Sequence, residues 1–76
     1  MRERIIKILK NINEEIVNDY DTDLIVLGII DSFDIATIIT EVEDSFNIEI
    51  DIEQVSIEKF RTVNLMIEFF EKVIEQ

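Results

Sequence analysis

The stretch "DSFDIATIITEVEDSF" (Asp31 to Phe46) decides the fold, because it carries the clearest amphipathic repeat in the chain. Its apolar side chains recur at spacings of three and four, as on a helix with one buried face. These side chains are Ile35, Ile38, Ile39, Val42 and Phe46. The outer side carries Asp34, Thr37, Glu41, Glu43 and Asp44. The stretch therefore predicts a helix that is apolar toward the core and acidic toward solvent.

Two further segments, one on each side of this helix, show the same repeat, and the chain has no proline to interrupt them. The first predicts an amphipathic helix over residues 2–17. Its apolar stripe is Ile5, Ile8, Leu9, Ile12 and Ile16. The second predicts a helix over residues 62–75, with Thr62 as its N-cap. Its stripe is Val63, Met66, Ile67, Phe70, Val73 and Ile74.

The connections between the helices differ in character. Residues 18–31 begin with polar turn formers and then become apolar without a helical stripe, which predicts a long loop. We expect Leu24, Leu27 and either Ile29 or Ile30 to pin this loop to the core. Residues 46–53 alternate like a half-buried strand, but no second alternating run can pair with them, so we expect an extended connector. A short helical turn is expected over residues 56–60.

The predicted fold class is all-α: a small helical bundle with three principal helices, one short extra helix and a long first loop. The 76 residues predict a single domain over residues 1–76. Apolar residues make up 47% of the chain, which argues against disorder despite the high charge. Because cysteine is absent, no disulfide supports the fold, and its stability rests on packing.

The net charge of −11 restricts the partners that this chain can have. A polyanion repels phosphate backbones, which argues against binding nucleic acid, whereas basic protein surfaces complement it. No apolar run approaches the roughly 20 residues that span a bilayer, and the charged start "MRERIIKILKNINEE" lacks a signal-peptide core. We therefore expect a cytoplasmic monomer without membrane insertion.

Catalysis by the chain itself is not expected. With no histidine and no cysteine, the usual activated-serine arrangements lack their base. The aspartates Asp19, Asp21 and Asp23 match the opening of a calcium-binding loop. Such a loop needs glycine at its sixth position and glutamate at its twelfth, where this chain has Leu24 and Ile30. We interpret the three aspartates as turn residues and predict no metal site.

The start of the central helix contains the candidate functional residue, Ser32. If Ser32 is the N-cap, the third helical residue is Ile35, which cannot complete a capping box. If Asp31 is the N-cap, that residue is Asp34, which suits the positive end of a helix. The second register is the better one and leaves the Ser32 hydroxyl free. A free hydroxyl beside an exposed Phe33 favours covalent modification over a simple capping role.

These residues resemble the acyl carrier protein family, and the resemblance covers nearly the whole chain. It rests on the run D-S-F-x-I-x-x-I-I-x-E-V-E-D-x-F-x-I-x-I, on the long loop before it and on the T-V pair before the last helix. The resemblance implies that Ser32 carries 4′-phosphopantetheine, transferred from coenzyme A by a phosphopantetheinyl transferase. The thiol of this group then holds an acyl or aminoacyl cargo as a thioester, and the carrier itself catalyses nothing.

The resemblance also implies roles for the neighbouring residues. Asp31 and Phe33 are read by the transferase. Basic patches on downstream biosynthetic enzymes meet the acidic residues Asp34, Glu41, Glu43 and Asp44. A long apolar cargo folds back between the helices near Ile38 and Val42.

Some residues depart from the fatty-acid carriers, notably the loop letters "GIID" and Thr37. These departures favour a stand-alone carrier in a specialised pathway, loaded by an AMP-forming ligase or an acyltransferase. The alternative is a small acidic protein-interaction module in which Ser32 is only a helix cap. That alternative predicts that Ser32→Ala leaves partner binding intact.

Overall fold

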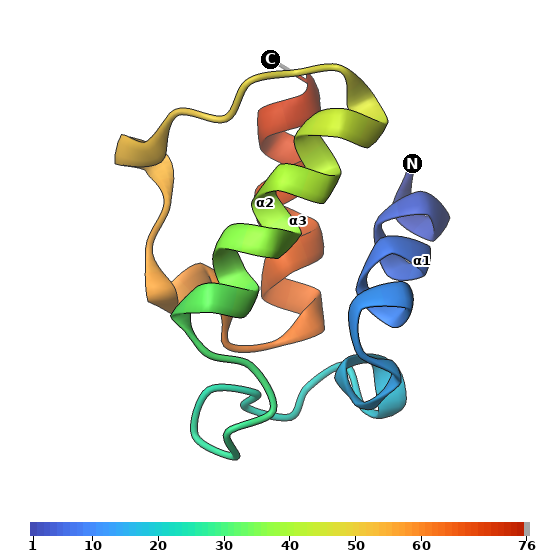
Figure 1. The fold of residues 1–76 in the computed structure, drawn as a ribbon, viewed down its shortest axis with the longest axis vertical. Coiled ribbons are helices and arrows are strands. Elements are labelled where there is room, and N and C mark those ends of the chain that lie inside the picture. Colours follow the sequence, from blue (N-terminus) through green and yellow to red (C-terminus); the bar gives the residue numbers. More distant parts are fainter. Residues whose placement is uncertain (76) are drawn as a thin grey trace.

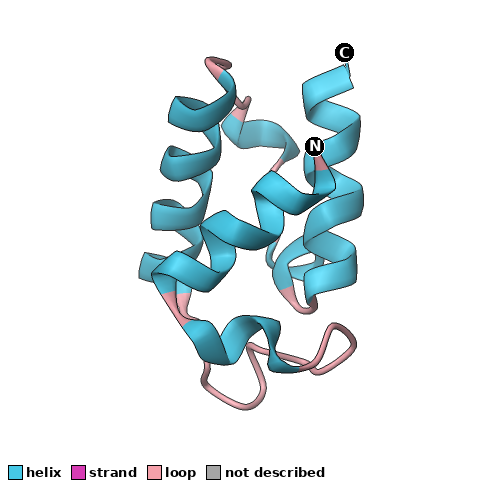
Figure 2. Cartoon of the chain, turned by 90° about the vertical axis from the view of Figure 1, so that its right-hand side faces the viewer, coloured by secondary structure: helices cyan, strands magenta, loops and turns pink. Residues whose placement is uncertain are grey.

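A computed structural model describes residues 1–75 as a bundle of three α-helices. They are α1 (Arg2–Ile12), α2 (Ser32–Phe46) and α3 (Val63–Glu75). Short 3-10 turns, η1 (Glu14–Asn18), η2 (Ile52–Gln54) and η3 (Ile57–Phe60), lie between them. Figure 1 shows α2 and α3 running in one direction and α1 in the opposite one. No strand occurs within residues 1–75 (Figure 2), so the predicted all-α class is confirmed.

The first helix is shorter than the sequence predicts. It ends at Ile12 instead of residue 17, because Asn13 has an extended backbone with φ −162° and ψ 115°. The Asn13 side chain then accepts a hydrogen bond from the backbone N–H of Glu15 at 3.0 Å and starts η1. Asparagine favours this local bonding over continuing a helix. Ile16 is nevertheless fully buried, as its place in the predicted stripe requires.

The core lies between the three helices and includes Phe69, a residue of α3 that the predicted stripe of this helix omitted. Phe60, Phe69 and Phe70 are buried with ring centroids 5.3 to 5.7 Å apart, within the range of favourable aromatic pairs. The other buried residues are Ile5, Leu9, Ile16, Leu24, Ile30, Ile35, Ile38, Val42, Ile50, Val63, Met66 and Ile67.

The first loop reaches the core through Leu24 and Ile30, but the prediction for Leu27 is wrong. Leu27 is 64% exposed. The backbone N–H groups of Ile29 and Ile30 both donate to the Leu24 carbonyl oxygen, at 2.9 and 3.3 Å, and this draws the two ends of a turn together. Residues 26–28 are therefore held outside the core, whereas Ile25 still packs against it. Gly28 permits the turn with its φ of +71°.

The sequence predicts that all three aspartates of the first loop are turn residues, and in the structure each of them accepts a hydrogen bond. The Asp19 carboxylate accepts from the N–H of Asp21 at 2.8 Å. Asp21 accepts from the side-chain amide of Asn64 at 2.6 Å, which ties the loop to α3. No group of three or more potential metal ligands occurs in the described part of the chain.

Arg61 joins the first loop to η3. Its guanidinium contacts the Asp23 carboxylate at 3.2 Å and the Glu58 carboxylate at 2.8 Å. In addition, the N–H of Leu24 donates to the Arg61 carbonyl oxygen at 2.7 Å. One residue thus fixes two segments that are far apart in the sequence.

These contacts predict a loss of stability in acid. The hydrogen bond from the Val26 N–H and the nearby Arg61 lower the pKa of Asp23 below its ordinary value of 3.8. Partial desolvation opposes them but does not cancel their effect. The hydrogen bond and charge of Arg61 lower the pKa of Glu58 below 4.5. Because the unfolded chain binds these protons more tightly, the stabilisation is present above the unfolded pKa values and is lost as the pH falls through the lowered folded ones.

Between pH 5 and pH 3, we expect the melting temperature of the double variant Asp23→Asn/Glu58→Gln to fall less than that of the wild type. Thermal unfolding followed by circular dichroism across this range measures the effect, which is modest because both carboxylates contact solvent. Glu14→Gln, on the exposed surface of η1, is the control for a change of charge alone. Parallel pH curves for the wild type and the double variant would contradict the prediction.

The remaining connections agree with the sequence in outline. Residues 48–51 form the predicted extended connector, with Ile50 buried. Its alternation stops at Ile52, because the Asp51 side chain accepts from the Glu53 N–H at 2.9 Å and starts the unpredicted turn η2. The turn expected over residues 56–60 is η3. Thr62 caps α3 as predicted, accepting from the Leu65 N–H at 3.1 Å.

Candidate functional site

The start of α2 is built as a capping box. The Asp31 carboxylate accepts from the N–H of Asp34 at 3.0 Å, and the Asp34 carboxylate accepts from the N–H of Asp31 at 3.0 Å. The N–H of Ile35 donates to the Asp31 carbonyl oxygen, also at 3.0 Å. The register in which Asp31 is the N-cap is therefore confirmed.

Ser32 is the first residue of α2 and is exposed to solvent. Within residues 1–75, no side-chain hydrogen bond engages its hydroxyl, since the capping role belongs to Asp31. Ile30 and Ile35 are buried on either side of it and hold this part of the chain against the core. The result is a hydroxyl on a backbone that is held in position, with its oxygen open to a second molecule.

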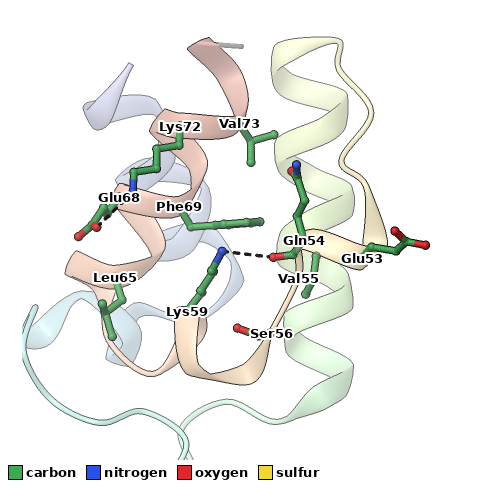
Figure 3. A pocket seen from close by; sticks show the side chains of 10 residues that line it. All are labelled: Glu53, Gln54, Val55, Ser56, Lys59, Leu65, Glu68, Phe69, Lys72 and Val73. Carbon is green, nitrogen blue, oxygen red and sulfur yellow. Dashed lines mark hydrogen bonds and ion pairs between the residues drawn. The ribbon is translucent and has the colours of Figure 1, made fainter.

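The surroundings of Ser32 are partly apolar. Phe33 is 78% exposed, which is unusual for so large an apolar side chain. Figures 1 and 3 both show η3 beside the first turn of α2, and η3 carries the exposed Ile57. The first loop runs directly into Asp31 from the other side (Figure 1). Ser32 thus lies between Asp31 and the exposed Phe33 in the chain, with η3 beside the same turn of α2.

The predicted acidic residues of α2 do not form a uniform surface. Glu41 and Asp44 are exposed, and no hydrogen bond or ion pair engages their side chains in the described part of the chain. Glu43 is half-buried, and its carboxylate accepts from the N–H of Ile50 at 2.8 Å. Asp34 is half-buried within the capping box. Glu43 thus anchors the connector that follows α2, whereas Glu41 and Asp44 face solvent.

The tripeptide Asp-Ser-Phe occurs twice, and the structure distinguishes the two copies. The second copy, residues 44–46, lies in the last turn of α2. The Ser45 hydroxyl and the Ser45 carbonyl oxygen both accept from the Arg4 guanidinium, the hydroxyl at 3.0 Å. The same guanidinium lies 4.1 Å from the centre of the Phe46 ring. Ser45 is therefore engaged within the protein, at the helix end where backbone carbonyls repel an anion.

Two cavities that the described residues form are not lined by Ile38 or Val42, which are fully buried. The larger one, about 440 Å³, lies between α3 and the segment that carries η2 and η3 (Figure 3). Phe69 and Lys59 are among its lining residues, with the Lys59 ammonium 5.0 Å from the centre of the Phe69 ring. Lys59 also donates to the Gln54 carbonyl oxygen at 3.5 Å.

The sequence did not predict the exposed pair Val26 and Leu27 in the loop that leads to Ser32, because Leu27 was expected in the core. A local signal was available. Asp23 followed by Gly28 brackets a turn, since aspartate side chains accept from nearby backbone N–H groups and glycine tolerates positive φ.

The excess of acidic groups predicts that salt stabilises the fold. Within residues 1–75, ion pairs involve four of the 18 acidic side chains, namely Glu3, Asp23, Glu58 and Glu68. We expect the melting temperature to rise between 10 and 100 mM NaCl, over which the Debye length falls from about 30 to about 10 Å. A magnesium series at matched ionic strength separates screening from ion binding. A flat NaCl series would contradict the prediction.

The comparisons with known proteins agree with this geometry. A family model described as a phosphopantetheine attachment site matches residues 1–70. No curated protein matches the chain. Within residues 1–75, no helix combines the length and the apolar character of a membrane span.

Proposed function

We propose that this chain, which belongs to the acyl carrier protein family of phosphopantetheine-binding domains, carries its 4′-phosphopantetheine on the hydroxyl of Ser32. The family is one of non-catalytic carriers, and 4′-phosphopantetheine is its prosthetic group. The observation that supports Ser32 most strongly is the capping box, because Asp31 and Asp34 leave the hydroxyl unused at an exposed position.

The attachment is a transfer of phosphopantetheine from coenzyme A. The Ser32 oxygen forms a bond to the phosphorus that carries the pantetheine, and the pyrophosphate bond of coenzyme A breaks. Adenosine 3′,5′-bisphosphate leaves, and the hydroxyl proton passes to a base on the transferase. The chain has no histidine or cysteine to act as that base, which agrees with its role as the substrate of a separate transferase.

The residues around Ser32 fit a phosphodiester. The first helical position of α2 is at the positive end of the helix, where an anion gains roughly 0.3–1 kcal/mol. The exposed side chain leaves room for a bulky substituent. The thiol of the bound group supplies the nucleophile that the sequence lacks, because the chain has no cysteine.

The finer function follows from the resemblance and the charge. We propose an acyl or aminoacyl thioester as cargo, loaded by an AMP-forming ligase or an acyltransferase in a specialised biosynthetic pathway. The 76 residues form a single carrier domain, cytoplasmic and monomeric. Two processes need this chain as a partner, namely modification by the transferase and delivery of the cargo to downstream enzymes with basic patches.

The recognition residues divide between these two processes. We assign Asp31 and Phe33 to the transferase, because they flank Ser32. The exposed Glu41 and Asp44 are the main contacts for basic partner surfaces, with Asp34 and Glu43 adding charge beside their internal hydrogen bonds. Exposed charge pairs of this kind speed association more than they slow release, which suits a shuttle.

The test is an intact mass measurement. The purified protein is incubated with coenzyme A, magnesium and a broad-specificity phosphopantetheinyl transferase that modifies a control carrier. We expect the mass to increase by one phosphopantetheinyl group, located on Ser32 by fragmentation of the modified peptide. A protein that gains no mass while the control carrier is modified would overturn the proposal and favour the interaction module.

A further inference from the structure

The first loop exposes two adjacent aliphatic side chains, Val26 and Leu27, which we call the aliphatic tip. Val26 is 74% exposed and Leu27 is 64% exposed. Single exposed aliphatic residues are common on protein surfaces and need no explanation. Two neighbours on one turn, a few residues before a modification site, form a small apolar surface at a place where another protein must bind.

The aliphatic tip is held in a defined position. One oxygen of the Asp23 carboxylate accepts from the N–H groups of Ile25 and Val26, both at 3.1 Å. The other oxygen contacts the Arg61 guanidinium at 3.2 Å, and Arg61 contacts Glu58 in η3 at 2.8 Å. The turn is therefore ordered before any partner arrives, which lowers the entropy that binding costs.

The aliphatic tip is close enough to Ser32 to contact the same partner. Leu27 precedes Ser32 by five residues, so their Cα atoms are at most about 18 Å apart. A protein interface of standard size buries about 800 Å² on each partner, equivalent to a disc of about 16 Å radius. The radius of such an interface centred on Ser32 is therefore nearly as large as the greatest possible distance to the tip. Figure 1 also shows the loop leading straight into α2.

We propose that the aliphatic tip is a docking element for the phosphopantetheinyl transferase, an inference that rests on the proposed attachment at Ser32. The transferase must bring its reacting phosphorus to the Ser32 oxygen itself. Loading and downstream enzymes act at the far end of the flexible arm and have no need to cover the first loop. The partner surface is an apolar recess that receives Val26 and Leu27.

The charges beside the tip support this choice of partner. The Asp23 carboxylate accepts from the Val26 N–H and so lies beside the tip, and Asp31 follows Leu27 by four residues. An enzyme that binds coenzyme A must place cationic groups around the phosphates near its active site. Basic groups at the edge of the recess therefore complement these two carboxylates, of which Asp23 is also paired with Arg61.

The experiment compares transferase kinetics for the wild type and for the double variant Val26→Ser/Leu27→Ser. The matched control is Ile52→Ser, because Ile52 is also 74% exposed but lies in η2, at the other end of the molecule from the loop in Figure 1. With coenzyme A saturating, we expect the kcat/KM for the double variant to fall about tenfold, mainly through KM, as removal of interface apolar contacts predicts. The control keeps the wild-type value.

Each other outcome overturns the inference in a recognisable way. Equal kcat/KM for the wild type and the double variant removes the tip from the transferase interface while leaving attachment at Ser32 intact. Normal modification with slower loading by a ligase assigns the tip to that enzyme instead. A dimer in sedimentation that the double variant abolishes assigns it to a second copy of the chain. A wild type that is not modified at all overturns the proposed function, and the inference with it.

One check separates docking from folding. Both side chains are exposed, so their replacement is expected to change the free energy of unfolding by no more than about 0.5 kcal/mol. Thermal unfolding of the double variant is therefore expected to match that of the wild type. A fall in melting temperature large enough to unfold the variant at the assay temperature would assign the tip a structural role and contradict the docking proposal.

Discussion

Ser32→Ala is expected to abolish attachment of phosphopantetheine completely, with no loss of folding. The substitution removes the only atom of residue 32 that can form the phosphodiester. It leaves the capping box intact, because the side chains of Asp31 and Asp34 make both of its hydrogen bonds. Intact mass after incubation with coenzyme A and an active transferase measures the result.

The second Asp-Ser-Phe tripeptide supplies a matched control within the same molecule. Ser45→Ala removes an equivalent hydroxyl from the same local sequence, but at the end of α2, where Arg4 engages it. We expect this variant to gain one phosphopantetheinyl group like the wild type. Modification of Ser32→Ala, or its loss in a folded Ser45→Ala variant, would contradict the assignment of the site.

Among the substitutions proposed here, Phe60→Ala is expected to lower the free energy of unfolding the most. The ring is fully buried and lies 5.6 and 5.7 Å from the rings of Phe69 and Phe70. Truncating a buried phenylalanine costs about 3–5 kcal/mol. A hydrophobic core in a domain of this size rarely supplies more than about 3–5 kcal/mol of net stability. We therefore expect a melting temperature at least about 12 °C lower, or a chain largely unfolded at 25 °C.

Phe33→Ala makes the same chemical change at an exposed site and is the matched control. Because Phe33 contributes little buried area, its loss is expected to change the free energy of unfolding by no more than about 0.5 kcal/mol. Urea and thermal unfolding followed by circular dichroism compare the two variants. Equal destabilisation by both substitutions would show that the aromatic cluster is not the centre of the core.

Much of the fold was predictable because its signals are local. The repeat of apolar residues in α2 and the capping preference of Asp31 and Thr62 act over one or two helical turns. Those elements were predicted correctly. The first helix was extended too far, because the apolar stripe continues to Ile16 through the 3-10 turn that follows Asn13. A stripe reports which side chains face the core, but it does not report whether the backbone between them stays α-helical.

By itself, the sequence determined the helical class, the register of the cap that frees Ser32 and the acidic character of the surface. Only the tertiary structure decided that Arg61 joins the first loop to η3 and that Ser45 is engaged by Arg4. The physical reason is the range of the interactions. Caps and helical repeats depend on residues within four positions, whereas the pairings with Arg61 and Arg4 join segments about 40 positions apart.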